Sequence, residues 1–305
     1  MAQTFKRLEI KYLLNDKQYS QLLPELLKIA EVDEYGKSRI NNIYYDTPDF
    51  RVIRTSLEKP VYKEKLRLRT YGDTTDMTNA FVELKKKYHG VVYKRRISAG
   101  YLDSLKYLAG DSELMSSMDK ENEPFDRLDK GMDRDFDIRE IQAESLRALK
   151  EKENGLRKSQ VKDEIDEFIK AYEGLRPAMI IGYDRIAMAG REDKEFRVTF
   201  DTNITWRTTD IDLRKGTDGQ QILEPGQHLM EIKIPLAFPL ELSRKMSELG
   251  IFPVSISKYG RAYIAMIKEA QIRYSNAYEY EEASGIYDIA AYSLLHTGML
   301  AVHGA

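Results

Sequence analysis

The chain has 305 residues, of which 42% are apolar and 32% are charged, a composition that excludes a fully disordered chain and is typical of a globular protein. It has no Cys and only 4 His, which excludes disulfides, thiolate metal sites and Cys nucleophiles and leaves carboxylate oxygens to bind any metal. No apolar run approaches the roughly 20 residues of a membrane-spanning helix, and no secretion signal opens the sequence. We therefore expect a cytoplasmic protein without a transmembrane segment.

Positive charge is concentrated in one part of the sequence. The formal net charge of the whole chain is only −2, yet residues 59–97 contain eleven Lys and Arg against four Asp and Glu. A local excess of this kind suits an anionic ligand, whereas a chain that is nearly neutral overall is poorly suited to wrapping a nucleic-acid duplex. We therefore expect a local anionic ligand and no nucleic acid.

The N-terminal part of the sequence predicts two strands, each followed by a helix. Residues 5–14 alternate between polar and apolar side chains, which is typical of a strand. Asp16 is expected to cap the helix that follows, and Pro24 is expected to break or kink it. Residues 41–47 form the second predicted strand, and Thr47 is expected to cap a short helix after it.

A meander and a charged insertion are predicted next. Residues 61–72, 80–87 and 91–97 read as three strands joined by tight turns, which is the pattern of an antiparallel meander. Residues 101–176 carry dense mixed charge and apolar stripes at helical spacing, so we expect a charged helical insertion there. Within it, residues 119–137 are polar enough to form a mobile loop.

Strands return in the C-terminal half of the sequence. We expect a single domain over residues 1–270, followed by a tail of unknown role over residues 271–305. Ser257 is the expected N-cap of the last helix, which places Lys258 in the first turn, where a cation calls for a nearby anion. The predicted strands cover about residues 178–188, 194–202, 206–211 and 228–235, and the predicted helices run from Pro239 to Gly250 and from Ser257 onwards.

Strand parity is the informative feature of this predicted sheet. Between residues 63 and 69 every odd position is basic, while Leu66 and Leu68 lie on the opposite face. A row of like charges is unfavourable, so we expect an anionic ligand to compensate it. Other pairs that share one face of a predicted strand are Glu9/Lys11, Glu83/Lys85, Lys94/Arg96, Tyr183/Arg185, Arg197/Asp201 and Glu231/Lys233.

Two folds are compatible with this alternation. One is an antiparallel sheet whose charged face lies in solvent. The other is an α+β fold in which about eight antiparallel strands close into a β-barrel, with helices packed outside and the charged faces inside. We favour the closed barrel, because the pattern recurs on seven strands with a bias to Lys and Arg. Since buried charge costs several kcal/mol per ion, such a lumen implies a bound polyanion and its metal.

Eight short motifs occur in the order found in a known family: RLEIKY, NIYYDTPDF, YKEKLRLRTYG, FVELKKKYHGVVYKRRI, YDR, FRVTFD, LMEIKI and SISKYGRAY. Over about residues 4–268 the chain resembles the vacuolar transporter chaperone (VTC) domain, the polyphosphate polymerase branch of the triphosphate tunnel metalloenzymes. The resemblance implies an antiparallel β-tunnel (a triphosphate tunnel) whose basic lining holds a triphosphate or a polyphosphate chain. Triphosphatases and cyclases of that superfamily open with Glu-x-Glu-x-Lys, but this chain has Arg7 in the first position, which lowers the expectation of simple hydrolysis.

The resemblance also assigns roles to particular residues. It implies Mn²⁺ or Mg²⁺ as the cofactor, with Glu231 as the principal metal ligand and Glu9 and Glu83 as weaker candidates. The implied catalytic residues are the basic side chains of Lys11, Arg67, Arg69 and Lys258, and the implied phosphate-binding residues are Lys85, Lys94, Tyr183, Arg185, Arg197 and Ser257.

We expect an ATP:polyphosphate phosphotransferase, an enzyme that transfers the γ-phosphate of ATP to a growing inorganic polyphosphate chain. One alternative is a metal-dependent tripolyphosphatase or nucleoside triphosphatase on the same tunnel. Another is a non-catalytic module that binds polyphosphate and docks a partner through residues 101–176. The expected ligands are ATP and inorganic polyphosphate or triphosphate, and the resemblance leaves room for a membrane-protein partner.

Overall fold

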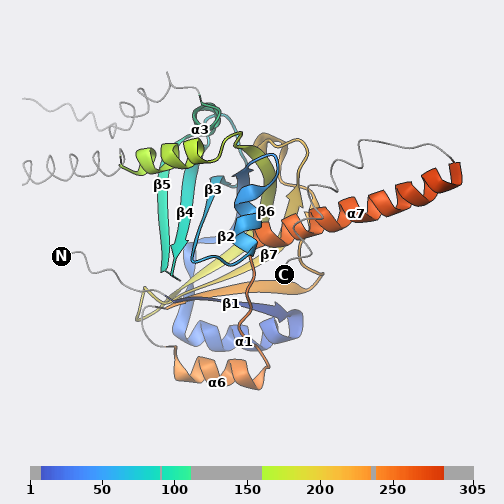
Figure 1. Ribbon diagram of the computed structural model, residues 1–305. Coiled ribbons are helices and arrows are strands. Elements are labelled where there is room, and N and C mark those ends of the chain that lie inside the picture. The colour runs from blue at the N-terminus through green and yellow to red at the C-terminus, as the bar shows by residue number, and fades with distance from the viewer. Residues whose placement is uncertain (1–7, 90, 111–159, 235–237, 285–305) are drawn as a thin grey trace, which may run out of the picture.

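The computed structural model describes residues 8–89, 91–110, 160–234 and 238–284, which form one antiparallel sheet and the helices around it (Figure 1). The mobile loop expected over residues 119–137 lies outside these ranges. Besides a helix at 160–171, the described elements are β1 (Leu8–Asn15), α1 (Asp16–Ile29), β2 (Ala30–Asp46), α2 (Arg51–Leu57), β3 (Tyr62–Tyr71), β4 (Asn79–Tyr88), β5 (Val91–Gly100), α3 (Tyr101–Leu108), β6 (Arg176–Gly190), β7 (Arg197–Arg207), the 3-10 turn Leu213–Lys215, β8 (Gln220–Gln221), β9 (Gln227–Ile234), α6 (Leu240–Glu248) and α7 (Lys258–Ser284).

Within the described residues the sheet has nine strands in the order β1-β9-β7-β6-β2-β3-β4-β5, with the short β8 beside β7. The paired strands are antiparallel, and β3, β4 and β5 form the predicted meander. The predicted α+β class is therefore confirmed. The predicted closure of the barrel is wrong, because β1 and β5 end the strand order and are not paired with each other.

Side chains and one loop segment close the gap that backbone pairing leaves open. Lys85 Nζ on β4 lies 3.5 Å from a carboxylate oxygen of Glu9 on β1, although these strands are far apart in the sheet order. Residues 253–256 run along the free edge of β1. Just beyond them, Ser257 Oγ accepts a hydrogen bond from Lys65 Nζ on β3 at 3.1 Å. The sheet therefore curls until β1 faces β3 and β4, and we call its concave side the inner face.

Two apolar clusters cover the outer side of the curled sheet. α1 and α6 pack against β1, β6, β7 and β9 around buried residues such as Leu22, Phe200 and Met246. α3 and the helix at 160–171 pack against β2, β3 and β4 around residues such as Leu66. Figure 1 shows the first pair of helices beneath β1 and the second pair at the opposite side of the molecule. These contacts confirm the prediction of helices packed outside the sheet.

α2 and α7 instead pack against part of the inner face, which the sequence analysis did not predict. This part is apolar, and it brings Met179 and Ile181 of β6 into one buried cluster with Ile53 of α2 and Tyr259 of α7. Ile180, between the two β6 residues, belongs to an outer cluster, as strand alternation requires. α2 and α7 therefore fill part of the enclosed space, and the charged part of the inner face lies beside them.

The predicted start and break of α1 are both wrong. Asn15, rather than Asp16, caps the helix through a capping box. The helix then continues through Pro24, which lies on its exposed side. Leu22 and Leu26, on either side of the proline, are fully buried in the outer cluster. Their burial outweighs the hydrogen bond that the proline removes.

Two further boundaries differ from the prediction. β2 is longer than predicted, because its polar first half, residues 30–40, pairs with β6 across a register shift. α2 begins at Arg51 and not directly after Thr47, the predicted cap, although the Thr47 hydroxyl accepts the Arg51 N–H at 2.8 Å. α7 continues across residue 270 to Ser284, and residues 285–305 lie outside the described part of the chain, so the division of the chain at residue 270 stays a prediction. In that described part, no helix combines the length and the apolar character needed to span a membrane.

Candidate functional site

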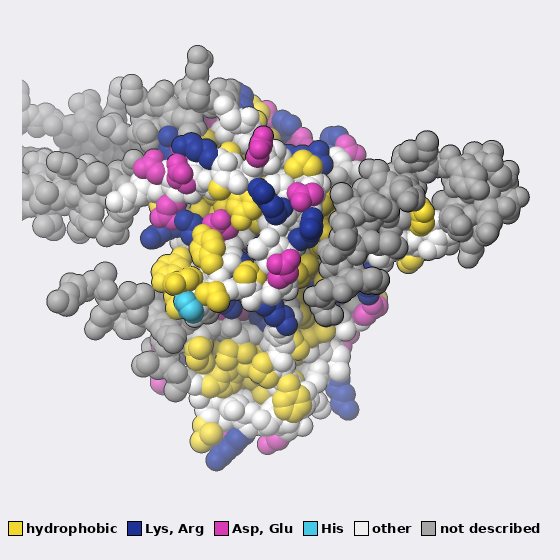
Figure 2. Space-filling view, in the orientation of Figure 1, with side chains coloured by type: hydrophobic (Ala, Val, Ile, Leu, Met, Phe, Trp, Pro, Cys, Tyr) yellow, Lys and Arg dark blue, Asp and Glu magenta, His cyan; other side chains and the backbone are white. Residues whose placement is uncertain are grey.

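The inner face carries the charged side chains that strand parity placed together. On β3, Leu66 and Leu68 are fully buried in the outer cluster, so the odd positions beside them face inward. By contrast, Figure 2 shows Lys and Arg interspersed with Asp and Glu over the face of the molecule that is turned to the viewer. The contacts of the inner face fall into three groups, which are centred on Glu83, Asp201 and Glu231.

The first group surrounds Glu83 on β4, whose side chain is 1% exposed. Arg67 Nη2 lies 2.7 Å and Arg69 Nε 3.7 Å from its Oε2 atom, and Lys94 Nζ contacts Oε1. Burial raises the pKa of Glu83, but these three cations outweigh burial and hold the pKa at about 2. The expectation that only a ligand compensates Arg67 and Arg69 is therefore wrong, and the role of Glu83 as a metal ligand stays a prediction.

The second group joins β6, β7 and α7 around Asp201, whose side chain is also 1% exposed. Asp201 accepts hydrogen bonds from Arg185 Nε at 2.6 Å, from Arg185 Nη2 at 2.8 Å and from Lys258 Nζ. Tyr183 connects this group to the first, since its hydroxyl accepts from Arg69 Nη2 at 3.0 Å. Burial raises the pKa of Tyr183, but the three neighbouring cations outweigh burial and lower the pKa to about 8. The predicted phosphate contacts Tyr183 and Arg185 thus lie beside Arg69 and Lys258, two of the predicted catalytic residues.

The N-terminus of α7 carries Lys258 to this group. Ser257 Oγ accepts the Gly260 N–H at 3.2 Å, which confirms the predicted N-cap. Lys258 is the first residue of α7, where the helix dipole disfavours a cation. The sequence analysis expected a bound anion to offset this effect, and the structure supplies the carboxylate of Asp201 for that purpose.

The third group lies on β1 and β9, around Glu231. Glu231 Oε1 is 3.1 Å from Lys233 Nζ, and its Oε2 is 3.6 Å from Lys11 Nζ. Lys11 Nζ is also 3.6 Å from Glu9 on the same strand. Burial raises the pKa of Glu231, but Lys233 and Lys11 outweigh burial and hold the pKa well below its usual range. Arg7, which the family resemblance singled out on this strand, lies outside the described residues.

Glu231 and Glu9 fit a Mg²⁺ or Mn²⁺ ion that is bound mainly through phosphate oxygens. Glu9 on β1 and Glu231 on the adjacent strand β9 both lie 3.6 Å from Lys11 Nζ, so the two carboxylates occupy the same part of the inner face. In the described ranges, no group of three or more His, Asp or Glu could hold a metal ion. Mg²⁺ is commonly bound by one or two carboxylates together with substrate phosphates. This donor set therefore suits a metal that arrives with a phosphate ligand, and it does not suit a metal held by protein alone.

Parity alone misjudged the importance of two residues on β7. Arg197 is exposed near the start of the strand, and its Nε donates to the backbone oxygen of Lys194 at 3.4 Å, so the structure does not bring it into the three groups. Asp201 was missed as a site residue, although it is an acid on the same predicted face and that signal could have identified it. Tyr44 was also missed, because it resembles a core residue; its hydroxyl accepts from Arg67 Nη1 at 3.3 Å.

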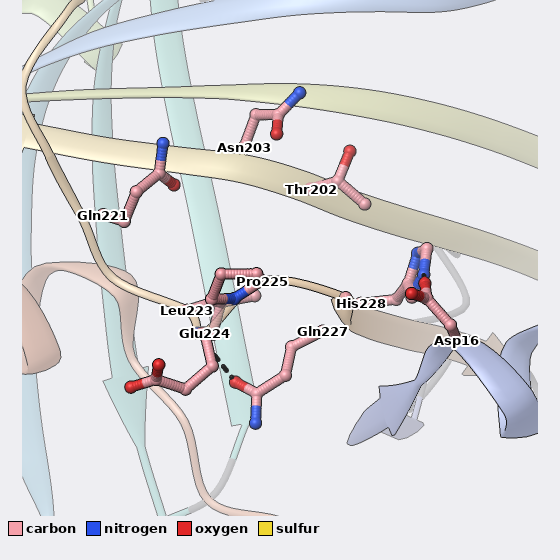
Figure 3. Close-up of a pocket in the computed structure, with 10 residues that line it drawn as sticks. Asp16, Thr202, Asn203, Gln221, Leu223, Glu224, Pro225, Gln227 and His228 are labelled. Atoms are coloured by element: carbon pink, nitrogen blue, oxygen red, sulfur yellow. Dashed lines mark hydrogen bonds and ion pairs between the residues drawn. The ribbon is translucent and has the colours of Figure 1, made fainter.

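Two surface cavities lie away from these groups. One, of about 400 Å³, lies between the start of α1, β7 and the loop before β9. Figure 3 shows Asp16 and His228 side by side at one end of it, joined at 2.7 Å, while Glu224 points away from them. The other, of about 520 Å³, is lined by polar residues that include Arg39 and Asp184. Neither cavity is lined by a predicted site residue, so the inner face is the candidate site.

The family model for the VTC domain matches residues 6–267, which is most of the chain and includes every predicted site residue. The chain belongs to the VTC domain family. Among proteins with curated descriptions, none matches this VTC domain.

This VTC domain is similar to several solved structures at low sequence identity. One is a candidate adenylate cyclase of Bacillus halodurans, with 11% identity and a TM-score of 0.41 over 83% of this chain and 95% of that chain. Another is a protein of Pyrococcus horikoshii, with 12% identity and a TM-score of 0.40 over 85% of this chain and 99% of that chain. A conserved hypothetical protein of Pyrococcus furiosus has 12% identity and a TM-score of 0.31 over 80% of this chain and 90% of that chain.

Proposed function

We propose that this VTC domain is a polyphosphate polymerase that transfers the γ-phosphate of ATP to a growing inorganic polyphosphate chain. The observation that carries the proposal is the excess of positive charge on the inner face. In the described residues, Lys or Arg side chains belong to this face on β1, β3, β4, β5, β6 and β9, and α7 adds Lys258. The acids that oppose them there are Glu9, Glu83, Asp201 and Glu231. Such an excess of positive charge favours a bound polyanion.

Phosphoryl transfer depends mainly on positioning and on neutralising charge, and planar guanidinium groups are suited to both. Asp201 binds the Nε and Nη2 edge of Arg185, and Glu83 binds the same edge of Arg67. Because the acids hold these guanidinium groups from one side, the side chains are oriented before any ligand arrives. In the proposal Arg67, Arg69 and Arg185 bind phosphate oxygens around the transferred group, while Lys11 and Lys258 add point charges.

The reaction needs neither a nucleophilic side chain nor a general base. The terminal phosphate of the polyphosphate chain is already an oxyanion, which forms the new bond to the γ-phosphorus. The bond from the γ-phosphorus to its bridging oxygen breaks, and ADP leaves with that oxygen. Mn²⁺ or Mg²⁺, held by Glu231 with Glu9, would neutralise phosphate charge at this site.

Incubation of the purified protein with ATP and Mn²⁺, followed by gel electrophoresis of the phosphate products, tests the proposal. We expect a ladder of polyphosphate chains. Free phosphate without a ladder would instead indicate a tripolyphosphatase or nucleoside triphosphatase on the same site. Binding of triphosphate without turnover would indicate a non-catalytic binding module. Arg95→Gln, on the outward side of β5, is a control that removes one arginine from the same sheet.

A further inference from the structure

An aromatic pair lies on the inner face, at the end where β3 turns into β4. The rings of Tyr71, the last residue of β3, and Phe81 on β4 meet edge to face, with centroids 5.9 Å apart and an interplanar angle of 80°. Tyr71 follows Arg69 on the same face of β3, and Phe81 precedes Glu83 on the same face of β4. The aromatic pair therefore adjoins the group around Glu83.

Arg96 on β5 lies against this pair. Its guanidinium carbon is 4.8 Å from the centre of the Phe81 ring, a cation–π contact. The register places Arg96 directly opposite Glu83, but three other cations bind that carboxylate. Within the parts of the chain that the structure describes, Arg96 forms no ion pair and no hydrogen bond. We call Tyr71, Phe81 and Arg96 the aromatic cluster.

The two cations that precede Arg96 on β5 differ from it. Lys94 contacts a buried carboxylate, and Arg95, on the outer side, lies 3.3 Å from a carboxylate oxygen of Glu164. Arg96 is exposed, and so is Tyr71, whose exposed fraction is 42%. In the described structure, a guanidinium without an acidic partner and an accessible aromatic ring thus lie around one half-buried phenylalanine, next to the proposed transfer site.

The residue types of the aromatic cluster indicate the kind of ligand. A guanidinium that contacts one ring from above leaves its other side open to a second flat group, and guanidinium groups stack on aromatic planes. Nucleotide bases stack in this way on tyrosine rings and on arginine. A phosphate gains from the charge of Arg96 but not from the rings of Tyr71 and Phe81. The cluster as a whole therefore fits a base better than it fits another phosphate.

The aromatic cluster also lies at a suitable distance from the proposed transfer site. Tyr71 and Arg67 share one face of β3 and are four residues apart, which separates their α-carbons by about 13 Å. Arg69 lies between them. A nucleoside triphosphate whose γ-phosphate lies at Arg67 can place its other phosphates beside Arg69 and its base at Tyr71. Inorganic triphosphate has no group that uses the rings of the aromatic cluster.

We propose that the aromatic cluster binds the base of the nucleoside triphosphate donor, with the base stacked on Arg96 beside the Tyr71 ring. This inference rests on the proposed function and adds the orientation of the donor, whose base points towards the turn between β3 and β4. The transfer site recognises phosphates, which ATP and inorganic triphosphate share. The aromatic cluster recognises the part of ATP that inorganic triphosphate lacks, so it makes the site selective for a nucleotide.

The test compares two probes by titration calorimetry at fixed concentrations of salt and Mn²⁺. One is an ATP analogue with an imido group between the β- and γ-phosphates, which blocks transfer, and the other is inorganic triphosphate. The variant is Tyr71→Ser combined with Arg96→Lys, which keeps the net charge. The control is Tyr93→Ser combined with Arg95→Lys, which makes the same changes at exposed positions on the outward side of β5.

We expect the variant to bind the ATP analogue at least about tenfold more weakly than wild type, a loss of about 1.4 kcal/mol. Its affinity for triphosphate should stay within about twofold, and the control should match wild type with both probes. Because both substituted side chains of the variant are exposed, it should fold, and Tyr71→Ser alone gives the same comparison otherwise.

Three results would overturn the inference. The variant could bind the ATP analogue as tightly as wild type does, which would exclude stacking at the aromatic cluster. It could lose the same factor of affinity with both probes, which would mean that the cluster acts on phosphates. The control could lose as much as the variant, which would indicate a general effect on the sheet. In all three cases wild type still binds triphosphate, so the proposed function would stand. If wild type binds neither probe, the proposed function itself fails, and this inference fails with it.

Discussion

The two halves of the β3–β4 hairpin share one alternation of residues and differ in how their charges are balanced. In the half with Arg67 and Arg69, the buried Glu83 binds both side chains before any ligand is present. In the other half, Lys63 and Lys87 face each other, and no ion pair joins either lysine to an acid of the described residues. The basic side chains of a strand face can therefore be paired with acids of the protein itself or can be left without such partners, and the positions of the acids decide between the two cases. This comparison predicts different responses to the same kind of mutation.

The largest effect is expected for Glu83→Gln. This change leaves Arg67, Arg69 and Lys94 close together without their carboxylate, and breaking a buried ion pair costs about 3–5 kcal/mol. Denaturant unfolding should show a loss of that order in the free energy of unfolding, with loss of turnover. Glu9→Gln is the matched control, because Glu9 is more exposed and should cost less than about 1 kcal/mol. Similar losses for the two variants would contradict the account of Glu83.

The pH dependence of stability gives an independent check on Glu83. Its pKa in the folded protein, about 2, is below the usual value of 4.5, so its ionised form stabilises the fold above pH 4.5. That contribution is lost as the pH falls from 4.5 towards 2. Wild type should therefore lose more stability than Glu83→Gln over this interval, and parallel curves would argue against a buried, ionised Glu83.

Arg67→Ala should cause the next largest effect, which is a loss of turnover of at least about a hundredfold, or 2.7 kcal/mol of transition-state stabilisation. It should also destabilise the fold, because Glu83 loses its closest partner. Steady-state kinetics and thermal unfolding measure the two effects. Arg95→Gln should leave turnover near that of wild type. Full activity of Arg67→Ala would remove this half of the hairpin from the transfer site.

Lys258→Ala tests the group around Asp201 in the same way. We expect turnover to fall at least about tenfold, or 1.4 kcal/mol, since Arg185 still binds Asp201 but one charge at the start of α7 is gone. Added triphosphate should raise the melting temperature of wild type more than that of the variant. Equal thermal shifts together with unchanged turnover would show that Lys258 has no part in phosphate binding.

Lys65 lies between the two halves of the β3–β4 hairpin, and its side chain should take up a proton when a phosphate ligand binds. Burial lowers its pKa to about 8, with neighbouring lysines adding to the effect, so near pH 8 it is partly neutral without ligand. A bound phosphate favours the charged form, so triphosphate binding should take up a fraction of a proton at pH 8. Calorimetry in buffers of different ionisation enthalpy measures this uptake. The same uptake by Lys65→Gln would assign the proton to another group.

The smallest effect is expected in the unbalanced half. Without ligand, Lys63→Gln should raise the free energy of unfolding by about 0.5 kcal/mol at low salt, because it removes a like-charge pair across the hairpin. High salt should abolish the gain, since exposed charges are then screened. Denaturant unfolding at two salt concentrations measures both. A loss of stability would mean that the Lys63 contact with Ser56 outweighs the repulsion.

Local alternation predicted most of the strands, their inner faces and most of the charged residues that meet there, but the separate strand expected over residues 206–211 is wrong, because β7 runs from Arg197 to Arg207. It could not predict partners: Asp201 was placed on one face with Arg197, but it binds Arg185 and Lys258. The contact partners depend on the register between neighbouring strands, and the sequence of a single strand does not determine that register.

The way in which the sheet closes and the position of α7 could not be predicted from the sequence either. The gap beside β1 is closed by the Lys85–Glu9 pair and by residues 253–256, and neither is a strand signal. α7 packs inside because part of the inner face is apolar, and this apolar part forms only when β6, β7 and β9 are brought together. The long β2 was missed because its first half is polar and shifts register against β6.

The central claim is that a phosphate chain binds on the inner face, and a crystal structure with bound inorganic triphosphate tests it most directly. The account predicts phosphate oxygens in contact with Arg67, Arg185 and Lys258. Triphosphate seated instead in the outer cavity beside Arg39, with the inner face unchanged, would contradict it.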